Sequence, residues 1–281
     1  MRLRRFFTGF LYTALAAVAM VLQTSLVLNQ PITGYFYFFV LSLVMVGYHS
    51  YYLLTAWQIG LYKTYVFSSS HLRWRFWVLL LFFPVLIATS ISLNLEFDVW
   101  LVLGLLFLFY FAIRSAKGLR GLKGLGWIKT IGLSCIWVYV TFYLPVKHFH
   151  LSLDSKIWVL MVQRFCFFFL IALFFDLRDQ VKDLYEQKST IATQFGKPRL
   201  LALVLGLIVV SAASIYCSYQ NEMMNLWSAL VLNSAVLFVG CLIYRHEQIK
   251  NRLNYLVLGD GSMILSTVLL FVDRISLLCC Q

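Results

Sequence analysis

Charged residues are scarce in this chain, and acidic residues are the scarcest. Only 12% of the 281 residues are charged, and 11 acidic residues stand against 23 basic ones, whereas 62% of the chain is hydrophobic. No polar, low-complexity or Pro/Gly-rich stretch is long enough to form a soluble domain or a flexible linker. The composition therefore argues against a soluble protein and predicts one transmembrane domain over residues 1–281.

The six cysteines also lack the spacing of a metal site or a disulfide framework. Most of them lie in apolar runs, where a cysteine behaves as a small apolar residue. The basic and then apolar N-terminus is similar to a secretory signal peptide, but its apolar run continues to Leu28, beyond the length of a signal core. We therefore interpret this segment as the first membrane span.

Long apolar runs are what the sequence has in abundance. A helix of about 20 apolar residues crosses roughly 30 Å of hydrocarbon. Nine segments are close to this length, and they predict an all-helical, polytopic membrane protein with nine transmembrane helices. The predicted spans are 6–28, 34–57, 76–93, 98–115, 126–146, 157–176, 199–217, 224–244 and 257–276.

Basic residues are unevenly distributed among the connections between these spans. Alternate segments, starting with the N-terminus, hold all of them except Lys147, Lys156, Arg164 and Arg274. Because cytoplasmic loops keep Lys and Arg, this pattern predicts a cytoplasmic N-terminus and an external C-terminus in a bacterial-type inner membrane. The net charge of +12 then indicates topology and attraction to anionic membrane lipid, and it argues against nucleic acid as a partner.

Two charged residues lie within predicted spans. Arg164 is in the sixth span, where a charge is usually functional, but its position near the outer end also suits a side chain that extends to the membrane surface. Asp260, followed by Gly261, lies near the start of the ninth span and is interpreted as a helix cap.

Three aspartates end the sixth apolar segment, in the stretch Asp176-Leu-Arg-Asp179-Gln-Val-Lys-Asp183. Residues at i, i+3 and i+7 of a helix lie on one face, so these carboxylates would line a stripe roughly 10 Å long. Like charges this close repel one another unless a cation lies between them, and oxygen ligands alone suit Mg²⁺ shared with a diphosphate. The alternative is a solvated, salt-bridged helix end, because basic residues alternate with the acids.

The same stretch, continued through Lys188-Ser-Thr190 to Gly196, resembles the second aspartate-rich motif of the UbiA superfamily of intramembrane prenyltransferases. The family pattern is D-x-x-D-x-x-x-D, followed by Lys/Arg-x-Thr and a Gly. The resemblance implies nine helices around a central cavity that opens to the cytoplasm, with the three aspartates as catalytic and metal-binding residues for Mg²⁺. It also implies that Arg178 and Lys188 bind the diphosphate, and that a prenyl group passes from prenyl diphosphate to a small acceptor.

A second stretch, Tyr110-Phe-Ala-Ile-Arg114, is similar to the Y-x-x-x-K motif of this family, with Arg in place of Lys. The resemblance implies that Tyr110 and Arg114 bind the diphosphate, and a guanidinium can hold phosphate through two hydrogen bonds. Lys117 begins a run that repeats a cation and a glycine every third residue. This run could fold over a phosphate, and it fits an ordinary cytoplasmic loop equally well.

The first acidic motif of the family, N-D-x-x-D-x-x-x-D, would fall on residues 49–57, where every acid is missing. His49 there is either a metal ligand or a hydrogen-bonded core residue. The loss leaves three readings of the chain: a prenyltransferase that activates diphosphate with one acidic cluster, a catalytically inactive relative that binds an isoprenoid or lipid, and a small-solute transporter. The sequence contains no signal for an oligomeric state or for the identity of the acceptor.

Overall fold

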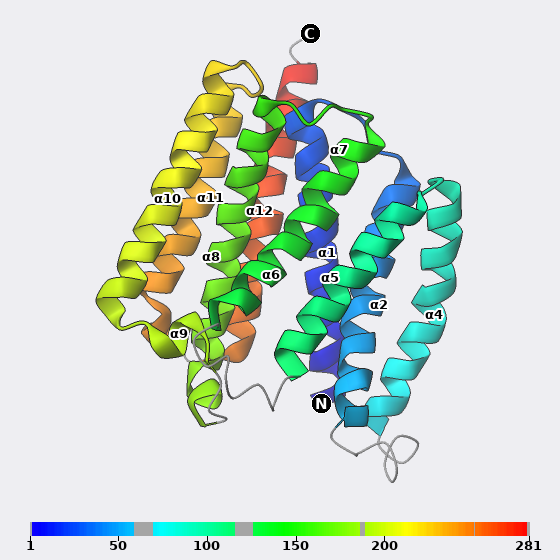
Figure 1. Cartoon of the computed structure of the whole chain (residues 1–281). Helices are drawn as coiled ribbons and strands as arrows, with labels where there is room; N and C mark the ends of the chain where they lie inside the picture. Colours follow the sequence, from blue (N-terminus) through cyan, green and yellow to red (C-terminus); the bar gives the residue numbers. More distant parts are fainter. Residues whose placement is uncertain (1, 59–69, 116–125, 186–188, 250, 280–281) are drawn as a thin grey trace. The chain divides into compact units, whose positions relative to one another are not determined.

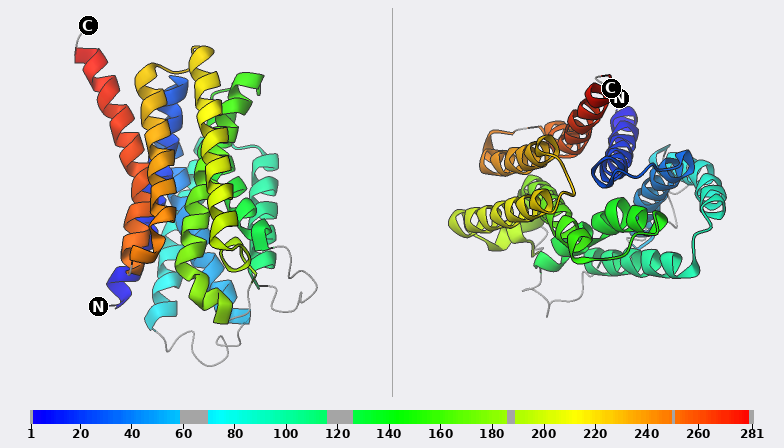
Figure 2. Two further views of the ribbon diagram at one scale, coloured as in Figure 1. Left: turned by 90° about the vertical axis from the view of Figure 1, so that its left-hand side faces the viewer. Right: turned by 90° about the horizontal axis from the view of Figure 1, so that it is seen from above.

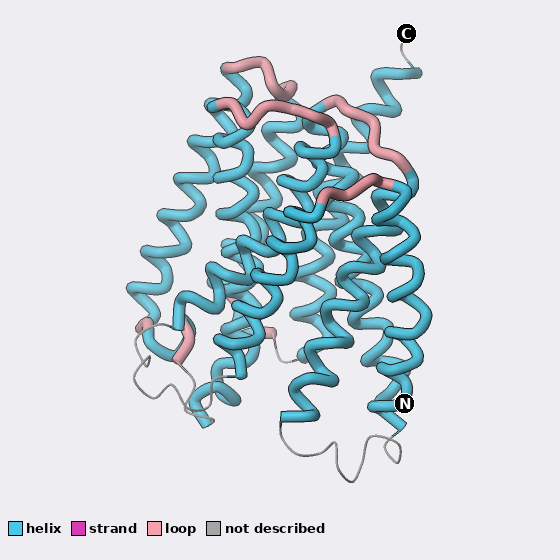
Figure 3. Tube along the Cα trace, turned by 45° about the vertical axis from the view of Figure 1, so that its right-hand side comes forward, coloured by secondary structure: helices cyan, strands magenta, loops and turns pink. Residues whose placement is uncertain are grey.

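The computed structural model describes the backbone of residues 2–58, 70–115, 126–185, 189–249 and 251–279. Side chains are described for residues 10–54, 73–109, 127–185, 189–249, 251 and 253–275. In the described ranges every regular element is a helix, and short loops join many of the helices (Figure 3). The chain divides into two compact units, residues 1–18 with 32–115 and residues 19–31 with 116–281. The expectation of a single domain over residues 1–281 stays a prediction.

The first unit is made of the start of α1 and three further helices (Figure 1). Their bounds are α1 (Arg2–Leu28), α2 (Gly34–Gln58), α4 (Ser70–Ser92) and α5 (Phe97–Ser115). Ala14, Met45 and Val78 bring α1, α2 and α4 together in one apolar core. Asn94 follows α4 at a positive φ of 48°, and Asn29 follows the end of α1, which belongs to the second unit, at 54°. Asparagine tolerates this left-handed conformation and so ends a helix without glycine.

The second unit contains the end of α1 and all later helices. The helices are α6 (Gly126–Val138), the π-helical turn η2 (Tyr139–Tyr143), α7 (Leu144–His148), α8 (Ser155–Tyr185), α9 (Ile191–Gln194), α10 (Lys197–Gln220), α11 (Leu226–Tyr244), the 3₁₀ turn η3 (His246–Gln248) and α12 (Arg252–Cys279). α10, α11 and α12 follow one another side by side (Figure 2).

Helix α8 is the centre of the second unit. It contacts α6, α9, α10, α11 and α12. In its apolar stretch 72% of the residues are buried within the protein, against 28% for α10. A helix that is apolar on every side and surrounded by others is a core helix. The position of α8 therefore fixes its polar C-terminal end against its neighbours.

Eight of the described helices are long and apolar enough to cross a membrane, and Phe97–Phe109 is a shorter apolar helix. Large apolar side chains such as Leu81, Val209 and Leu265 are exposed, which suits contact with lipid. The predicted all-helical membrane fold is confirmed. The fourth predicted span, 98–115, falls on α5, and its side chains from residue 110 onward lie outside the described residues, so the number nine stays a prediction.

A polar network in the second unit holds the end of α1 to α8. Arg164 is only 2% exposed and donates to the side chains of Gln23 and Thr24, at 3.4 Å for Thr24. Gln23 in turn donates to Ser266 of α12 at 2.8 Å. The interpretation of Arg164 as a side chain that extends to the membrane surface is therefore wrong, because the side chain is buried and both of its Nη atoms donate to acceptors inside the unit.

The π-helical turn between α6 and α7 belongs to the same network. Thr24 donates from Oγ1 to the carbonyl oxygen of Thr141 at 2.7 Å. A π turn disturbs the regular backbone hydrogen bonds of a helix, and a side-chain donor can stabilise the carbonyl that it exposes. The predicted fifth span, 126–146, is therefore three consecutive helical pieces, α6, η2 and α7.

Candidate functional site

The three predicted catalytic aspartates lie on the last turns of α8. The helix continues without a break from Ser155 to Tyr185, so the spacing of the aspartates is the helical spacing that the sequence predicted. Asp176 and Asp183 are 4% and 6% exposed, whereas Asp179 is partly exposed. Two buried carboxylates at the end of a core helix need compensating groups from the rest of the second unit.

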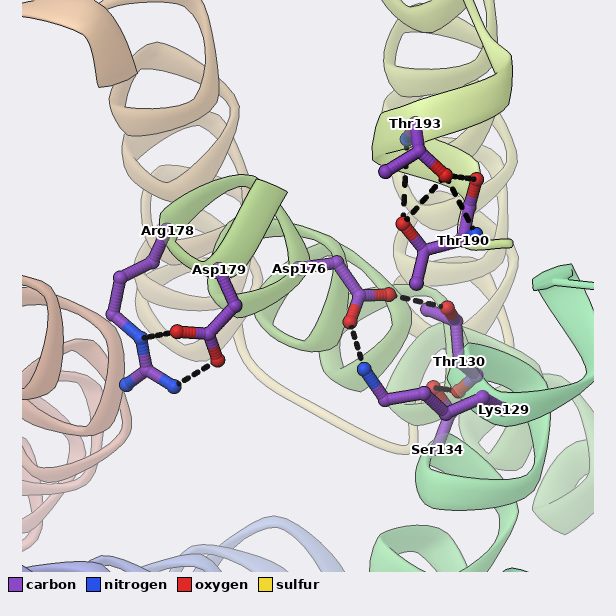
Figure 4. A network of polar contacts seen from close by, with 8 residues as sticks. All are labelled: Lys129, Thr130, Ser134, Asp176, Arg178, Asp179, Thr190 and Thr193. Atoms are coloured by element: carbon purple, nitrogen blue, oxygen red, sulfur yellow. Dashed lines mark hydrogen bonds and ion pairs between the residues drawn. The ribbon is translucent and has the colours of Figure 1, made fainter. Parts of the chain in front are cut away.

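Asp176 is held by two residues of α6. Lys129 donates from Nζ to Oδ1 at 2.6 Å, and Thr130 donates from Oγ1 to Oδ2 at 2.7 Å (Figure 4). The hydroxyl of Ser134 lies one turn further along α6 and donates to the carbonyl oxygen of Thr130. Both oxygens of the carboxylate are therefore engaged, one by a cation and one by a neutral hydroxyl.

Asp179 is directed to its own helix instead. The guanidinium of Arg178 holds it through Nε at 3.1 Å and Nη2 at 2.7 Å (Figure 4). Arg178 also lies over the ring of Phe175, with 5.0 Å between Cζ and the ring centroid. Asp176 is therefore paired with a cation from α6, whereas Asp179 is paired with a cation from α8 itself.

The downstream part of the motif folds back against α8. Thr190 is the N-cap of α9, where its side chain and that of Thr193 each bond the other's backbone N–H, at 3.3 and 2.8 Å. Gln180 ties this segment to α8 by donating to the carbonyl oxygen of Ala192 at 2.7 Å. Gly196 precedes α10 in an extended conformation, and a Cβ there meets only Pro198, at an ordinary 3.9 Å. Thr190 therefore has a structural role as a helix cap. The backbone conformation and surroundings of Gly196 would also accept a residue with a side chain.

The other predicted site residues are only partly described. Tyr110 and Arg114 are on α5 of the first unit, and their side chains lie outside the described residues. Lys117 and Lys188 lie outside the described residues altogether. Their roles at the diphosphate stay predictions.

The segment where the resemblance would put a first acidic motif, residues 49–57, is on α2 in the first unit. His49 is 1% exposed, and its ring packs edge-on against Phe10 at 5.3 Å between centroids. Arg75 of α4 lies over the ring of Tyr52 at 4.2 Å. An aromatic cluster with a cation therefore occupies this part of α2, and His49 is a core residue.

The donor set at the end of α8 fits a divalent cation that is shared with a substrate. Among the described residues, no group of three or more His, Cys, Asp or Glu side chains lies close enough to hold a metal ion alone. Mg²⁺ is usually bound by one or two carboxylates together with water and substrate phosphates. The oxygen-only chemistry of Asp176 and Asp179 suits such a site, in which the diphosphate supplies the remaining ligands.

Sequence reasoning missed the partners of Asp176 and misread one buried acid. In the sequence, Lys129 and Thr130 lie near the start of the fifth predicted span and belong to no motif. Asp176 follows them by 47 and 46 residues, and no local pattern relates residues so far apart. Asp260 is not a cap, since it lies well inside α12 and is 2% exposed. It follows Gly259, where a Cβ would meet the rings of Phe174 and Phe175 just before Asp176. A buried acid inside a span is itself a signal for function.

The sequence matches no protein-family model and no curated protein. Two solved structures are similar to the chain. The apo structure of a UbiA homolog from Aeropyrum pernix K1 superimposes with a TM-score of 0.64 at 14% identity, over 93% of this chain and 98% of that chain. A structure reported for digeranylgeranylglyceryl phosphate synthase gives 0.57 at 12% identity, over 96% of this chain and 97% of that chain. The chain therefore has the fold of the UbiA superfamily, which the aspartate pattern at the end of its sixth apolar segment indicated.

Proposed function

We propose that this protein is a membrane prenyltransferase that transfers a prenyl group from a prenyl diphosphate to a small acceptor. The observation that supports it most is the carboxylate cluster on α8, with cations beside it, in a chain that has the UbiA fold. One of the structural neighbours is itself described as a digeranylgeranylglyceryl phosphate synthase. Fold alone does not assign a reaction, so the proposal depends on the cluster.

In this proposal Asp176, Asp179 and Asp183 would hold Mg²⁺ together with the diphosphate, which would supply the remaining oxygen ligands. The metal, when bound, neutralises the diphosphate and makes it a better leaving group. The residues then stabilise the charge that develops as the allylic C–O bond breaks and its electron pair leaves with the diphosphate. The acceptor nucleophile forms the new bond to carbon and loses its proton.

Cations of the chain assist the leaving group in this proposal. Arg178 is next to the cluster, and Tyr110, Arg114, Lys117 and Lys188 are proposed to contact the diphosphate. Because the first acidic motif is missing, the site has fewer carboxylates for metal than its family, and fixed cations supply part of the stabilisation instead. We place the site at the cytoplasmic side of the membrane, by the distribution of basic residues.

Product analysis tests the proposal. Purified protein in lipid nanodiscs is incubated with farnesyl or geranylgeranyl diphosphate, Mg²⁺ and a panel of aromatic and glycerol-based acceptors, and lipid products and released diphosphate are measured. Asp179→Asn should lower diphosphate release by about a hundredfold or more, as expected for loss of a group that stabilises transition-state charge. Asp154→Asn is the matched control, since Asp154 caps the opposite end of α8 by accepting from the N–H of Ile157 at 2.9 Å, and asparagine keeps that cap.

The outcomes separate the three readings of the sequence. Magnesium-dependent binding of prenyl diphosphate without release of diphosphate would favour the catalytically inactive relative. No binding at all would contradict both and leave the transporter. Release that is equal in wild type and Asp179→Asn would remove the cluster from the reaction.

A further inference from the structure

We propose that Lys129 changes partners during the binding cycle: it pairs with Asp176 when the site has no metal, and it binds the diphosphate when Mg²⁺ occupies the carboxylates. This inference rests on the proposed function. It adds a diphosphate ligand from α6 that no motif contains.

The pair of Lys129 with Asp176 is the observation that supports this inference. Lys129 Nζ lies 2.6 Å from Asp176 Oδ1, and the side chain of Asp176 is only 6% exposed. Burial of a carboxylate costs free energy unless a counter-charge and hydrogen bonds compensate for its lost hydration. Lys129 supplies the charge, and Thr130 supplies a hydrogen bond at 2.7 Å to the other oxygen.

Binding of metal makes the same lysine unfavourable at the same oxygen. A divalent cation on Asp176 replaces the charge that Lys129 supplied, and it repels an ammonium a few ångströms away. The incoming diphosphate brings several negative charges to the same place. The ammonium therefore gains by moving from the carboxylate to a phosphate oxygen, and the sum of charges in the site stays nearly balanced.

Lys129 is built for such a change. Its side chain is 20% exposed, more than three times the exposure of its partner, so solvent reaches part of it. A lysine ammonium is a compact charge on a flexible stem with three donors, and it can reorient without losing a fixed two-pronged geometry. Thr130 keeps its hydroxyl on Asp176, so the carboxylate retains its orientation when the ammonium leaves.

Two affinities measured separately test the inference. The first is for Mn²⁺ alone, followed by the electron paramagnetic resonance signal of the unbound ion. The second is for inorganic pyrophosphate at saturating Mg²⁺, by calorimetry on the purified full-length protein. Lys129→Met should strengthen Mn²⁺ binding by roughly tenfold, because a competing cation is removed. It should weaken pyrophosphate binding by about tenfold to about a hundredfold, the effect of one lost charge-assisted hydrogen bond.

One control keeps the positive charge at position 129, and the other removes a positive charge at a different position. Lys129→Arg should bind pyrophosphate within a few-fold of wild type. Lys197→Met removes a more exposed lysine, which pairs with Glu247 at 3.4 Å, and it should change neither affinity. If Lys129→Met does not give folded protein, the same two affinities are measured on Lys129→Gln. Glutamine keeps an N–H donor for Asp176 but carries no charge.

The test depends on Lys129→Met changing the two affinities in opposite directions, stronger for Mn²⁺ and weaker for pyrophosphate. An ion pair with only a structural role predicts that both affinities fall together or that neither changes, and either result would overturn the exchange of partners. A wild-type protein that binds neither Mn²⁺ nor magnesium pyrophosphate would instead refute the proposed function itself. A wild type that binds both, with Lys129→Met unchanged, would leave that function standing and remove Lys129 from the site.

Discussion

At the scale of single residues, the aspartates at the end of α8 differ in the cation that neutralises each of them. Asp176 takes its cation from α6, whereas Asp179 takes it from its own helix. Breaking a buried pair by removing one partner leaves an uncompensated charge and costs roughly 3–5 kcal/mol. Loss of Lys129 should therefore destabilise the protein through Asp176. Arg178 and Asp179 are each 25% exposed, so loss of Arg178 should cost less.

His49 gives a prediction that belongs to this scale. It is 1% exposed in the first unit, and neither ring nitrogen has a hydrogen-bond partner among the described residues. A buried polar group without a partner costs about 1–3 kcal/mol, so His49→Phe should raise the free energy of unfolding by about 1 kcal/mol. Thermal unfolding in detergent measures it. Thr89→Val is the control, because the hydroxyl of Thr89 donates to Val85 at 2.7 Å and its loss should bring no gain. A destabilised His49→Phe would show that the imidazole has a polar role.

The aspartate pattern also shows how far sequence reasoning reaches at this scale. Helical spacing placed Asp176, Asp179 and Asp183 correctly on one helix, because that relation is local. Lys129 and Thr130 could not be found in the same way, since their contacts with Asp176 exist only after α6 packs against α8. Two readings of Arg164 stayed open in the sequence, and its burial decides between them, because its acceptors come from α1.

At the scale of elements, buried polar contacts join helices that apolar packing alone would leave free to slide. Arg164 and Gln23 connect α8 with α1, and Gln23 continues to Ser266 on α12. Gln23→Leu should destabilise the protein by about 3 kcal/mol, because it removes an acceptor from a buried guanidinium. Arg164→Met in the same chain should recover a large part of that loss. The double-mutant cycle, measured by denaturation in mixed micelles, reports the coupling. Additive effects would mean that the two side chains do not interact.

Gly259 tests the contact between α12 and α8. A Cβ at this position would lie 2.9 Å from Cζ of Phe175 and 3.4 Å from Cδ1 of Phe174. Gly259→Ala should therefore cost about 1–3 kcal/mol, the usual range for an overpacked core. It should also weaken metal binding, because the two phenylalanines directly precede Asp176. The control is Gly206→Ala in α10, where nothing lies within 4 Å of a new Cβ and the change should be neutral or stabilising. Equal effects of the two substitutions would exclude close helix contact as the cause.

At the scale of the whole molecule, the fold is shared with a protein of very different sequence. The chain superimposes on a UbiA homolog at 14% identity, and every acid of the first motif is replaced in its sequence. Apolar helix surfaces tolerate exchange of one apolar residue for another when volume and pattern are kept. Sites depend on particular groups, so the fold was predictable from apolar runs and one motif, whereas the reaction needs its own test.

Topology is the last prediction, and it depends on α5. This helix has 19 residues, and at about 1.5 Å per residue a helix of that length is roughly 28 Å long, enough to cross the hydrocarbon. With α5 as a span, the chain crosses nine times, so a reporter inserted in the segment 116–125 should be cytoplasmic and one fused after Gln281 should be external. The basic residues of the inner segments favour this orientation. Two reporters test each position independently. Alkaline phosphatase is active only outside the cytoplasm, and green fluorescent protein is fluorescent only inside it. A cytoplasmic C-terminus together with an external 116–125 segment would show that α5 does not cross the membrane.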